Sequence, residues 1–161
     1  MTDEVPDKLA ALVDAVRALD RLGVPHALVG GVAVGLRSGV PRATLDRNIA
    51  VRSWVERDAL IEALSAAGLR LTGAFAHSLN FRHPSGEPVQ IVVDPAFDAM
   101  IDRAEPLELS GVRIRVVTTA DLIAMKERAA TDPARRRSKA LRDQADIALL
   151  RGDVPDPNEG W

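Results

Sequence analysis

One continuous segment constrains the fold more than any other part of the chain: residues 26–52, HALVGGVAVGLRSGVPRATLDRNIAVR. A short apolar stretch over 27–29 runs into the pair Gly30-Gly31, and small apolar residues typical of a short helix follow. A Ser-Gly-Val-Pro turn then leads into a second apolar stretch over 44–51. This order of strand, helix and strand is typical of a sheet with helices packed on it.

The rest of the chain continues the alternation. Apolar residues recur three and four positions apart over 9–19, which predicts an amphipathic helix. Further helices are expected over 32–36, 55–67, 97–103, 121–130 and 134–150, and further strands over 69–72, 78–82, 89–94, 107–109 and 112–117. The resulting order, α-β-α-β-α-β-β-β-α-β-β-α-α, predicts an α/β (α+β) fold: a mixed sheet flanked by helices, with a helical C-terminus. We expect a single domain over 1–152 and a loosely ordered, Pro- and Asp-rich tail over 153–161.

Composition excludes several classes of function. The chain is 47% hydrophobic and 27% charged, with a net charge of −2, so no global basic field attracts it to nucleic acid or membranes. The absence of cysteine excludes disulfides and thiolate metal sites, and it favours a cytoplasmic protein. An acidic, polar N-terminus predicts no signal peptide, and no apolar run predicts a membrane span. Only 3% of residues are aromatic, which argues against a base-stacking platform.

Asp46 and Asn48 stand two residues apart on the strand expected over 44–51. Alternate residues of a strand point to the same face, so both side chains can converge on one ligand, while Arg47 between them points to the opposite face. The segment resembles the active-site opening of the nucleotidyltransferase superfamily, in the branch of small AbiEii-like bacterial domains. The resemblance implies that the strand–Gly-Gly–helix unit holds a nucleoside triphosphate (NTP). It also implies an Asp-x-Asp on the next strand that holds magnesium, with a third acid from a neighbouring strand.

The positions that match this carboxylate triad are Asp46, Asn48 and Gln90, the last taken from the segment PVQIVVD. Two of the three are therefore amides, which keep an oxygen but lose the negative charge. Each metal contact supplies several kcal/mol, so losing two costs about four orders of magnitude in rate. Asp94 shares a face with Gln90 but lies about 13 Å along the strand. The structural alternative for Asp46 is a strand-edge acid bonded to a backbone N–H.

Gly30 and Gly31 are the expected phosphate-binding residues. Glycines at the start of a helix let backbone N–H groups approach an anion, although a glycine pair also marks an ordinary tight turn. Arg42 faces phosphate in the functional interpretation and is solvated at a turn in the structural one.

Two C-terminal segments extend the resemblance. Residues 121–126, DLIAMK, resemble the family helix that delivers a lysine, here Lys126, toward the triphosphate. Residues 142–147, RDQADI, resemble the family's Lys/Arg-Asp-x-x-Asp-Ile segment, in which Asp143 and Asp146 share one helix face. These two acids either orient Lys126 or Arg42, or pair with Arg142 and Lys139 at the surface. Lys126 is otherwise an exposed helix lysine.

A basic run of three arginines over 135–137, followed by Lys139 and Arg142, has two interpretations. It contacts triphosphate or an RNA acceptor, or it is a solvated helix start. Its position conflicts with the helix dipole, which prefers acids in the first turn.

Three hypotheses for function follow from the resemblance. The first is a working transferase that moves a nucleoside monophosphate from NTP to a small molecule, protein or tRNA, with magnesium as cofactor, Asp46 as main metal ligand and Lys126 on the phosphates. The second is a non-catalytic domain that still binds nucleotide through Gly30, Gly31 and Lys126. The third is a partner-binding protein of a toxin–antitoxin or regulatory system, whose pocket is a relic. The sequence leaves the acceptor, the preferred base and the oligomeric state open.

Overall fold

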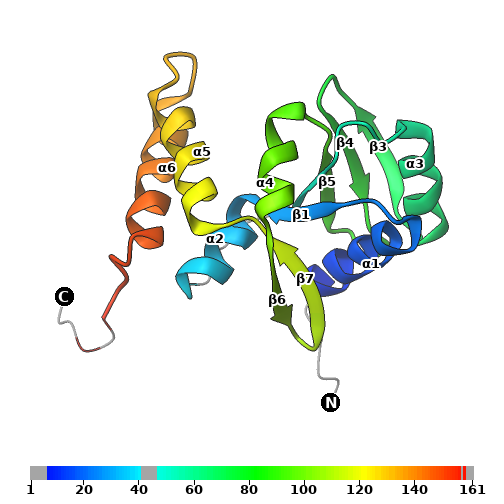
Figure 1. Ribbon diagram of the computed structural model, residues 1–161, viewed down its shortest axis with the longest axis horizontal. Coiled ribbons are helices and arrows are strands. Elements are labelled where there is room, and N and C mark those ends of the chain that lie inside the picture. Colours follow the sequence, from blue (N-terminus) through cyan, green and yellow to red (C-terminus); the bar gives the residue numbers. More distant parts are fainter. Residues whose placement is uncertain (1–6, 41–46, 157, 159–161) are drawn as a thin grey trace.

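The computed structural model describes residues 7–40, 47–156 and 158 (Figure 1). Its order of helices and strands is the order predicted from the sequence, with one 3₁₀ helix added, η1 (Pro95–Phe97). The expected mixed sheet flanked by helices is confirmed. No helix within the described ranges is long and apolar enough to cross a membrane.

Seven strands form one mixed sheet in the order β3-β4-β5-β2-β1-β7-β6. The strands are β1 (His26–Val29), β2 (Asn48–Val51), β3 (Arg70–Ala74), β4 (Ser78–Arg82), β5 (Pro88–Val92), β6 (Glu105–Leu109) and β7 (Val112–Val116). Two neighbouring pairs, β2 with β5 and β1 with β7, run parallel, and the remaining neighbours run antiparallel. The helices are α1 (Asp7–Leu22), α2 (Gly30–Ser38), α3 (Arg57–Ala66), α4 (Asp98–Arg103), α5 (Thr119–Thr131) and α6 (Arg137–Leu150).

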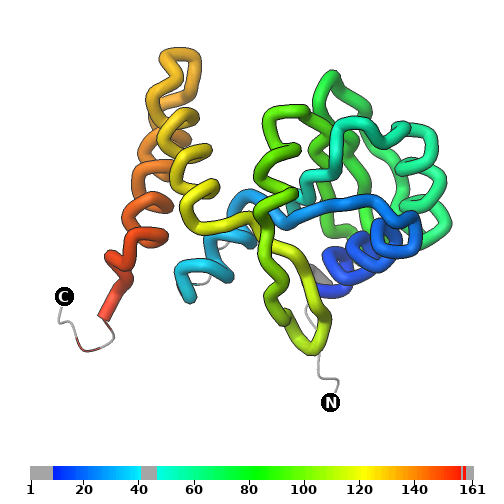
Figure 2. The backbone as a smooth tube through the Cα atoms, in the orientation of Figure 1, coloured from blue at the N-terminus to red at the C-terminus, as the bar shows by residue number. Residues whose placement is uncertain are grey.

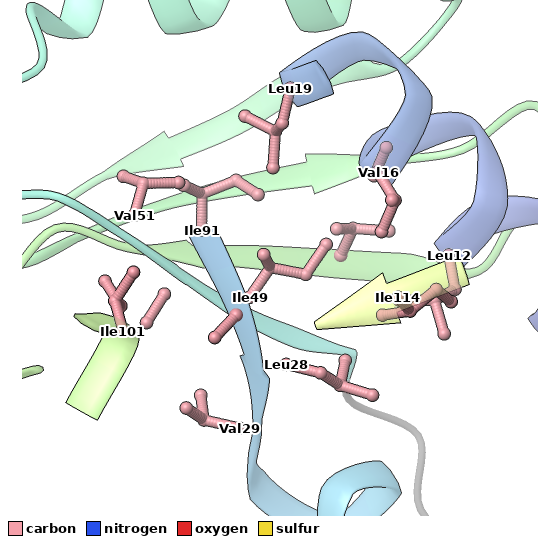
Figure 3. Packing of buried hydrophobic residues seen from close by; sticks show 14 of the residues in the cluster. Leu12, Val16, Leu19, Leu28, Val29, Ile49, Val51, Ile91, Ile101 and Ile114 are labelled. Carbon is pink, nitrogen blue, oxygen red and sulfur yellow. The ribbon is translucent and has the colours of Figure 1, made fainter. Parts of the chain in front are cut away.

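The hydrophobic core lies between the sheet and its helices. Figure 3 shows Leu12, Val16 and Leu19 of α1 close to strand residues such as Ile49 and Ile91. α3 packs beside α1, whereas α4 contacts β1 and β2. Both faces of these central strands are therefore buried, while the strands toward β3 alternate between buried and partly exposed residues. That alternation is typical of a sheet with one face on the core and one open to solvent.

The last two helices stand apart from the strands. α5 and α6 form an antiparallel hairpin that packs on α2 (Figures 1 and 2). The side chain of Arg37, in the last turn of α2, fixes this arrangement by donating to the carbonyl oxygens of Val116 and Val117 at 3.0 Å each. α2 is therefore the element that joins the sheet to the helical hairpin.

Several boundaries differ from the sequence prediction, each for a structural reason. α2 begins at Gly30 and ends at Ser38, because Gly30, with a φ of 79°, turns the chain directly from β1 into the helix. β3 ends at Ala74 rather than Thr72, and the register of its pairing with β4 shifts between Leu71 and Gly73. This shift is a β-bulge, which a count of alternating residues does not detect.

Two further boundaries move for different reasons. α6 begins at Arg137, because the preceding residues form a turn after Pro133. β2 begins at Asn48, and the expected strand residues 44–46 lie outside the described residues.

Candidate functional site

A row of three amide side chains crosses the sheet. Asn48 on β2 is the register partner of Gln90 on β5, and Gln90 is the register partner of Asn80 on β4. Register partners point to the same face of a sheet, with neighbouring strands about 4.8 Å apart. The residues on either side of each amide along its strand are buried, such as Leu79 and Phe81 around Asn80. The amide row, Asn48–Gln90–Asn80, therefore lies on the face away from α1 and α3.

The row begins at the N-terminus of α2. Asn48 also pairs with Val29, the residue before Gly30. A Cβ placed on Gly30 would lie 2.8 Å from the side-chain nitrogen of Asn48, so only glycine leaves room for this contact. The first turn of α2 has no side-chain cap and no acidic residue. Uncapped backbone N–H groups at a helix N-terminus favour an anion, and phosphate binding by Gly30 and Gly31 stays a prediction.

Two oxygens of the amide row are unsatisfied. The Oδ1 atoms of Asn48 and Asn80 are buried and have no hydrogen-bond partner in the part of the chain that the structure describes. A buried acceptor left without a donor costs about 1 to 3 kcal/mol. Such a cost is tolerated at sites where a ligand supplies the missing donor.

The far end of the row opens into a cavity of about 260 Å³ beside the bulge in β3. Gly73 is the register partner of Asn80, so the bulge leaves Thr72 as the extra residue between two paired positions. The Thr72 hydroxyl donates to the Asn80 backbone oxygen at 3.2 Å. Gln90 and Arg82 also line the cavity. Sequence reasoning missed Asn80 and Thr72. The only sequence feature that marks Asn80 is its place as a polar residue between two large apolar residues in a short strand. The bulge that orients Thr72 has no recognisable sequence pattern.

The described residues do not form the expected metal site. Asp46 and Arg42 lie outside the described residues, so their roles stay predictions. Asp94 accepts a hydrogen bond from the backbone N–H of Ala96 at 3.0 Å, which caps η1 and excludes it from the row. No group of three or more His, Cys, Asp or Glu residues within 7–40, 47–156 and 158 could hold a metal ion. Magnesium prefers carboxylate oxygens, and Asn48 and Gln90 offer neutral ones, so this part of the pocket does not fit a two-metal site.

Arg47 lies on the opposite face from Asn48, as expected from strand alternation, but it is not a surface or edge residue. Its side chain is 4% exposed and lies 3.8 Å from the Glu87 carboxylate. Its backbone oxygen accepts from the Gln90 N–H at 2.8 Å, which extends the β2–β5 pairing and fixes Gln90 beside Asn48.

A charged cluster forms the second part of the candidate site. Lys126 on α5 lies 3.4 Å from Asp143 and 3.1 Å from Asp146, both on α6. Arg135, in the turn between the helices, makes two bonds to Asp143, at 2.9 and 3.1 Å. Both aspartates are 1% exposed. We refer to these four residues as the helical charge cluster.

The cluster favours one of the alternatives left open by the sequence. Asp143 and Asp146 both contact Lys126, as the orienting role requires, whereas a role toward Arg42 stays a prediction. Lys126 is not an exposed lysine, since its side chain is 16% exposed. The basic run is also divided: Arg135 is bound to Asp143, whereas Arg136 and Arg137 are exposed at the start of α6. The pairing of Arg135 was missed, because Arg135 and Asp143 are adjacent only after the chain turns.

An ion pair joins α4 to the first turn of α5. Arg103 donates two hydrogen bonds to Asp121, at 2.9 and 2.8 Å. The bond from Arg103 lowers the pKa of the Asp121 carboxyl below its ordinary value, partly opposed by burial and helped by the Thr118 hydroxyl. The same bond raises the pKa of Arg103. The pair orients α5 with respect to the sheet through α4.

Comparison with known proteins assigns the chain to a family. A family model described as "Nucleotidyl transferase AbiEii toxin, Type IV TA system" matches residues 11–159. The chain therefore belongs to the AbiEii nucleotidyltransferase family, as the sequence resemblance indicated. A search of the curated proteins finds no match.

Solved structures share the fold. The antibiotic-resistance factor ANT(2'')-Ia superposes with a TM-score of 0.65 at 17% identity, over 91% of this chain and 85% of that chain. The lincosamide adenylyltransferase LnuA, bound to lincomycin, gives 0.64 at 13% identity, over 90% and 97%. A nucleotidyltransferase-like protein from Paracoccidioides brasiliensis gives 0.61 at 22% identity, over 87% and 74%. At these identities the likeness shows a nucleotidyltransferase fold and nothing about substrates.

Proposed function

We propose that this protein binds a nucleoside triphosphate at the N-terminus of α2 and that its nucleotidyl transfer is strongly attenuated. The observation that carries the proposal is the register pairing of Asn48 with Gln90. It brings two matched family positions side by side next to Gly30, where the family's chemistry requires them, but both are neutral amides. This pairing supports a site that keeps its position on the sheet and loses its charge.

Loss of charge matters because this chemistry depends on divalent ions. In nucleotidyl transfer such ions bridge the phosphates and stabilise the leaving pyrophosphate, and they are held by anionic oxygen ligands. The described residues of the amide row supply none, so no catalytic step through a metal is assigned here. If each lost acid removes several kcal/mol of stabilisation, two losses reduce turnover by about four orders of magnitude. Any magnesium binding then depends on Asp46.

Nucleotide binding is supported by a different feature. The uncapped first turn of α2 presents backbone N–H groups beside Gly30 and Gly31, and these groups favour a phosphate without a metal ion. Lys126 contributes less free charge than the resemblance implies, because two carboxylates and Arg135 surround it. In this proposal Lys126, Asp143 and Asp146 position the helical hairpin against α2. Arg42, outside the described residues, stays the predicted cation for phosphate.

The family description also suggests a context in the cell. AbiEii proteins are described as toxins of a toxin–antitoxin system. For this chain we propose a cytoplasmic location and an antitoxin as partner. The antitoxin would counteract the activity of the transferase pocket. Magnesium is the expected ion if Asp46 binds one.

Calorimetry tests the proposal directly. Purified protein is titrated with ATP, with and without magnesium. We expect binding in both buffers with affinities within about tenfold of each other, because backbone N–H groups supply most of the contact. Binding that requires magnesium, together with steady release of pyrophosphate, would show a working transferase instead. No binding in either buffer would mean that the pocket has lost its ligand.

Restoring the acids sharpens the test. The double variant Asn48→Asp with Gln90→Asp should make ATP binding dependent on magnesium and raise pyrophosphate release, because it returns two anionic ligands to adjacent positions. Ser78→Asp is the matched control, since Ser78 lies on the same face of β4 but outside the row. An equal response from Ser78→Asp would show that added charge alone, and not the row, explains the change.

A further inference from the structure

The cavity at the far end of the amide row is built differently from the rest of the pocket. Its polar side chains are Thr72, Asn80, Arg82 and Gln90. Phe81 and Val89 also line it, but each residue is 1% exposed and its side chain belongs to the core on the other face, so the cavity meets mainly their backbone. The cavity therefore has hydrogen-bonding walls and almost no flat apolar surface.

Its chemistry excludes several classes of ligand. None of the described residues that line it carries a carboxylate, so this part of the cavity does not suit a cation. Arg82 is its only cation among the described lining residues, and that side chain already donates to the Gly86 carbonyl at 2.7 Å, so a free anion finds little charge. A nucleobase binds best against aromatic or apolar planes, and among the described lining residues Pro88 is the single apolar side chain available.

The cavity contains hydrogen-bond acceptors that a ligand with donor groups can satisfy. Asn80 Oδ1 is buried and without a partner. The Thr72 hydroxyl uses its proton on the Asn80 backbone, which leaves its oxygen free to accept. Gln90 adds a further amide from β5. A volume of about 260 Å³ lies below the range typical of pockets for drug-sized ligands, which suits a single-ring molecule.

We propose that this cavity binds a small, uncharged polyhydroxylated molecule, whose O–H groups donate to Asn80, Thr72 and Gln90. Because the amide row connects the cavity to the N-terminus of α2, the bound hydroxyls lie along the same face as the nucleotide. In this arrangement the polyol occupies the part of the pocket where the acceptor of the nucleotidyl group binds. That role as acceptor rests on the proposed function, whereas binding of the polyol does not.

The experiment uses the full chain without nucleotide. Backbone amide shifts are followed by NMR during titration with D-glucose and with myo-inositol, and separately with adenosine, inorganic phosphate and magnesium. We expect glucose or inositol to shift the amides of Thr72, Asn80 and Gln90 with millimolar affinity. Shifts at these residues from adenosine, phosphate or magnesium but from neither polyol would overturn the proposal, as would no shift there with any probe.

Variants separate binding from folding. Asn80→Ala should weaken polyol binding about tenfold, because it removes the deepest acceptor. Ser78→Ala, two residues away on the same face, should leave binding unchanged. Urea unfolding of both variants checks that each is folded. If Asn80→Ala does not fold, Thr72→Val is the second variant that removes an acceptor from the cavity. Equal losses for Asn80→Ala and Ser78→Ala would contradict the proposal. Because no ATP is present, a failure of nucleotide binding does not affect this result.

Discussion

The amide row on the sheet and the helical charge cluster on α5 and α6 both contain residues from sequence segments that resemble the family, yet the two regions depart from the family pattern in different ways. In the amide row, Asn48 and Gln90 have the expected positions without the expected charge. In the helical charge cluster, Lys126, Asp143 and Asp146 keep their charges, but the charges are bound to one another and to Arg135. The amide row is neutral because its side chains carry no charge. The helical charge cluster is neutral because its positive and negative side chains are paired.

This difference shows what each region is able to do. A buried ion pair is costly to break, because removing one partner leaves an uncompensated charge. The helical charge cluster is therefore a rigid structural unit. The amide row contains two unsatisfied oxygens and opens into a cavity, so a ligand can improve its bonding. Ligand binding is thus expected at the row, and positioning of the helices at the cluster.

The largest effect is expected from breaking the cluster. Asp143→Ala removes the acceptor of both Lys126 and Arg135 and should lower the free energy of unfolding by about 4 kcal/mol. Urea unfolding measures it. Glu127→Gln is the matched control, because Glu127 also joins α5 to the end of α6, through Arg151, but in an exposed pair that contributes about 1 kcal/mol or less. Similar losses for the two variants would mean that burial of the cluster is not what stabilises it.

The next effect tests the start of the amide row. Gly30→Ala combines a positive φ with a close contact to Asn48 and should destabilise by about 2 to 3 kcal/mol. Gly39→Ala has a nearly equal φ, 76° against 79°, but nothing within 4 Å of the added Cβ, so it should cost about 1 kcal/mol. Thermal or urea unfolding of the pair isolates the contact with Asn48. If the two variants lose the same stability, the close packing at Gly30 is not a constraint.

A smaller effect follows from giving charge back to the row. Without a divalent ion, the double variant Asn48→Asp with Gln90→Asp places like charges on register partners and should lose about 1 kcal/mol of stability. Adding magnesium should restore the lost stability, because the ion bridges the two carboxylates. Unfolding is measured in chelator and in magnesium. A variant that is indifferent to magnesium would show that the two positions do not share a ligand.

The smallest effect concerns the tie between α4 and α5. Because Arg103 lowers the pKa of Asp121 in the folded state, the pair stabilises the protein above the carboxyl's ordinary pKa of 3.8, and this stabilisation disappears as the pH falls through the lower folded value. Asp121→Asn should therefore lower the urea midpoint at pH 7, and the gap to the unmodified chain should narrow in acid. A gap that is constant from neutral to acid pH would exclude a contribution from ionised Asp121.

Much of the fold could be predicted from the sequence because its signals are local. Helical periodicity over 9–19, glycine and proline turns, and alternation in the short strands gave the order of elements, which the structure confirms. Boundaries failed where a neighbouring element decides them. The bulge in β3 depends on its pairing with β4, and the start of α2 depends on the positive φ of Gly30.

The candidate site could be predicted in part for the same reason. Asn48 and Gln90 were identified by motif, and β2–β5 pairing places them side by side. Asn80 and Thr72 belong to no motif, and Arg135 looked like one member of a solvated basic run. Their roles arise from contacts between segments that the sequence gives no way to match. Asp46 and Arg42, which lie outside the described residues, stay predictions.

The sequence by itself determined the family and the order of helices and strands, and it predicted amides at two positions of the matched triad, because all three depend on residue identity and local spacing. The tertiary structure decided which polar groups are satisfied. Strand register aligned three amides and left two of their oxygens without donors, while the packing of α5 against α6 paired Lys126 with Asp143 and Asp146. Hydrogen bonds and ion pairs depend on distances of a few ångströms between residues far apart in the chain, and only the folded arrangement fixes those distances.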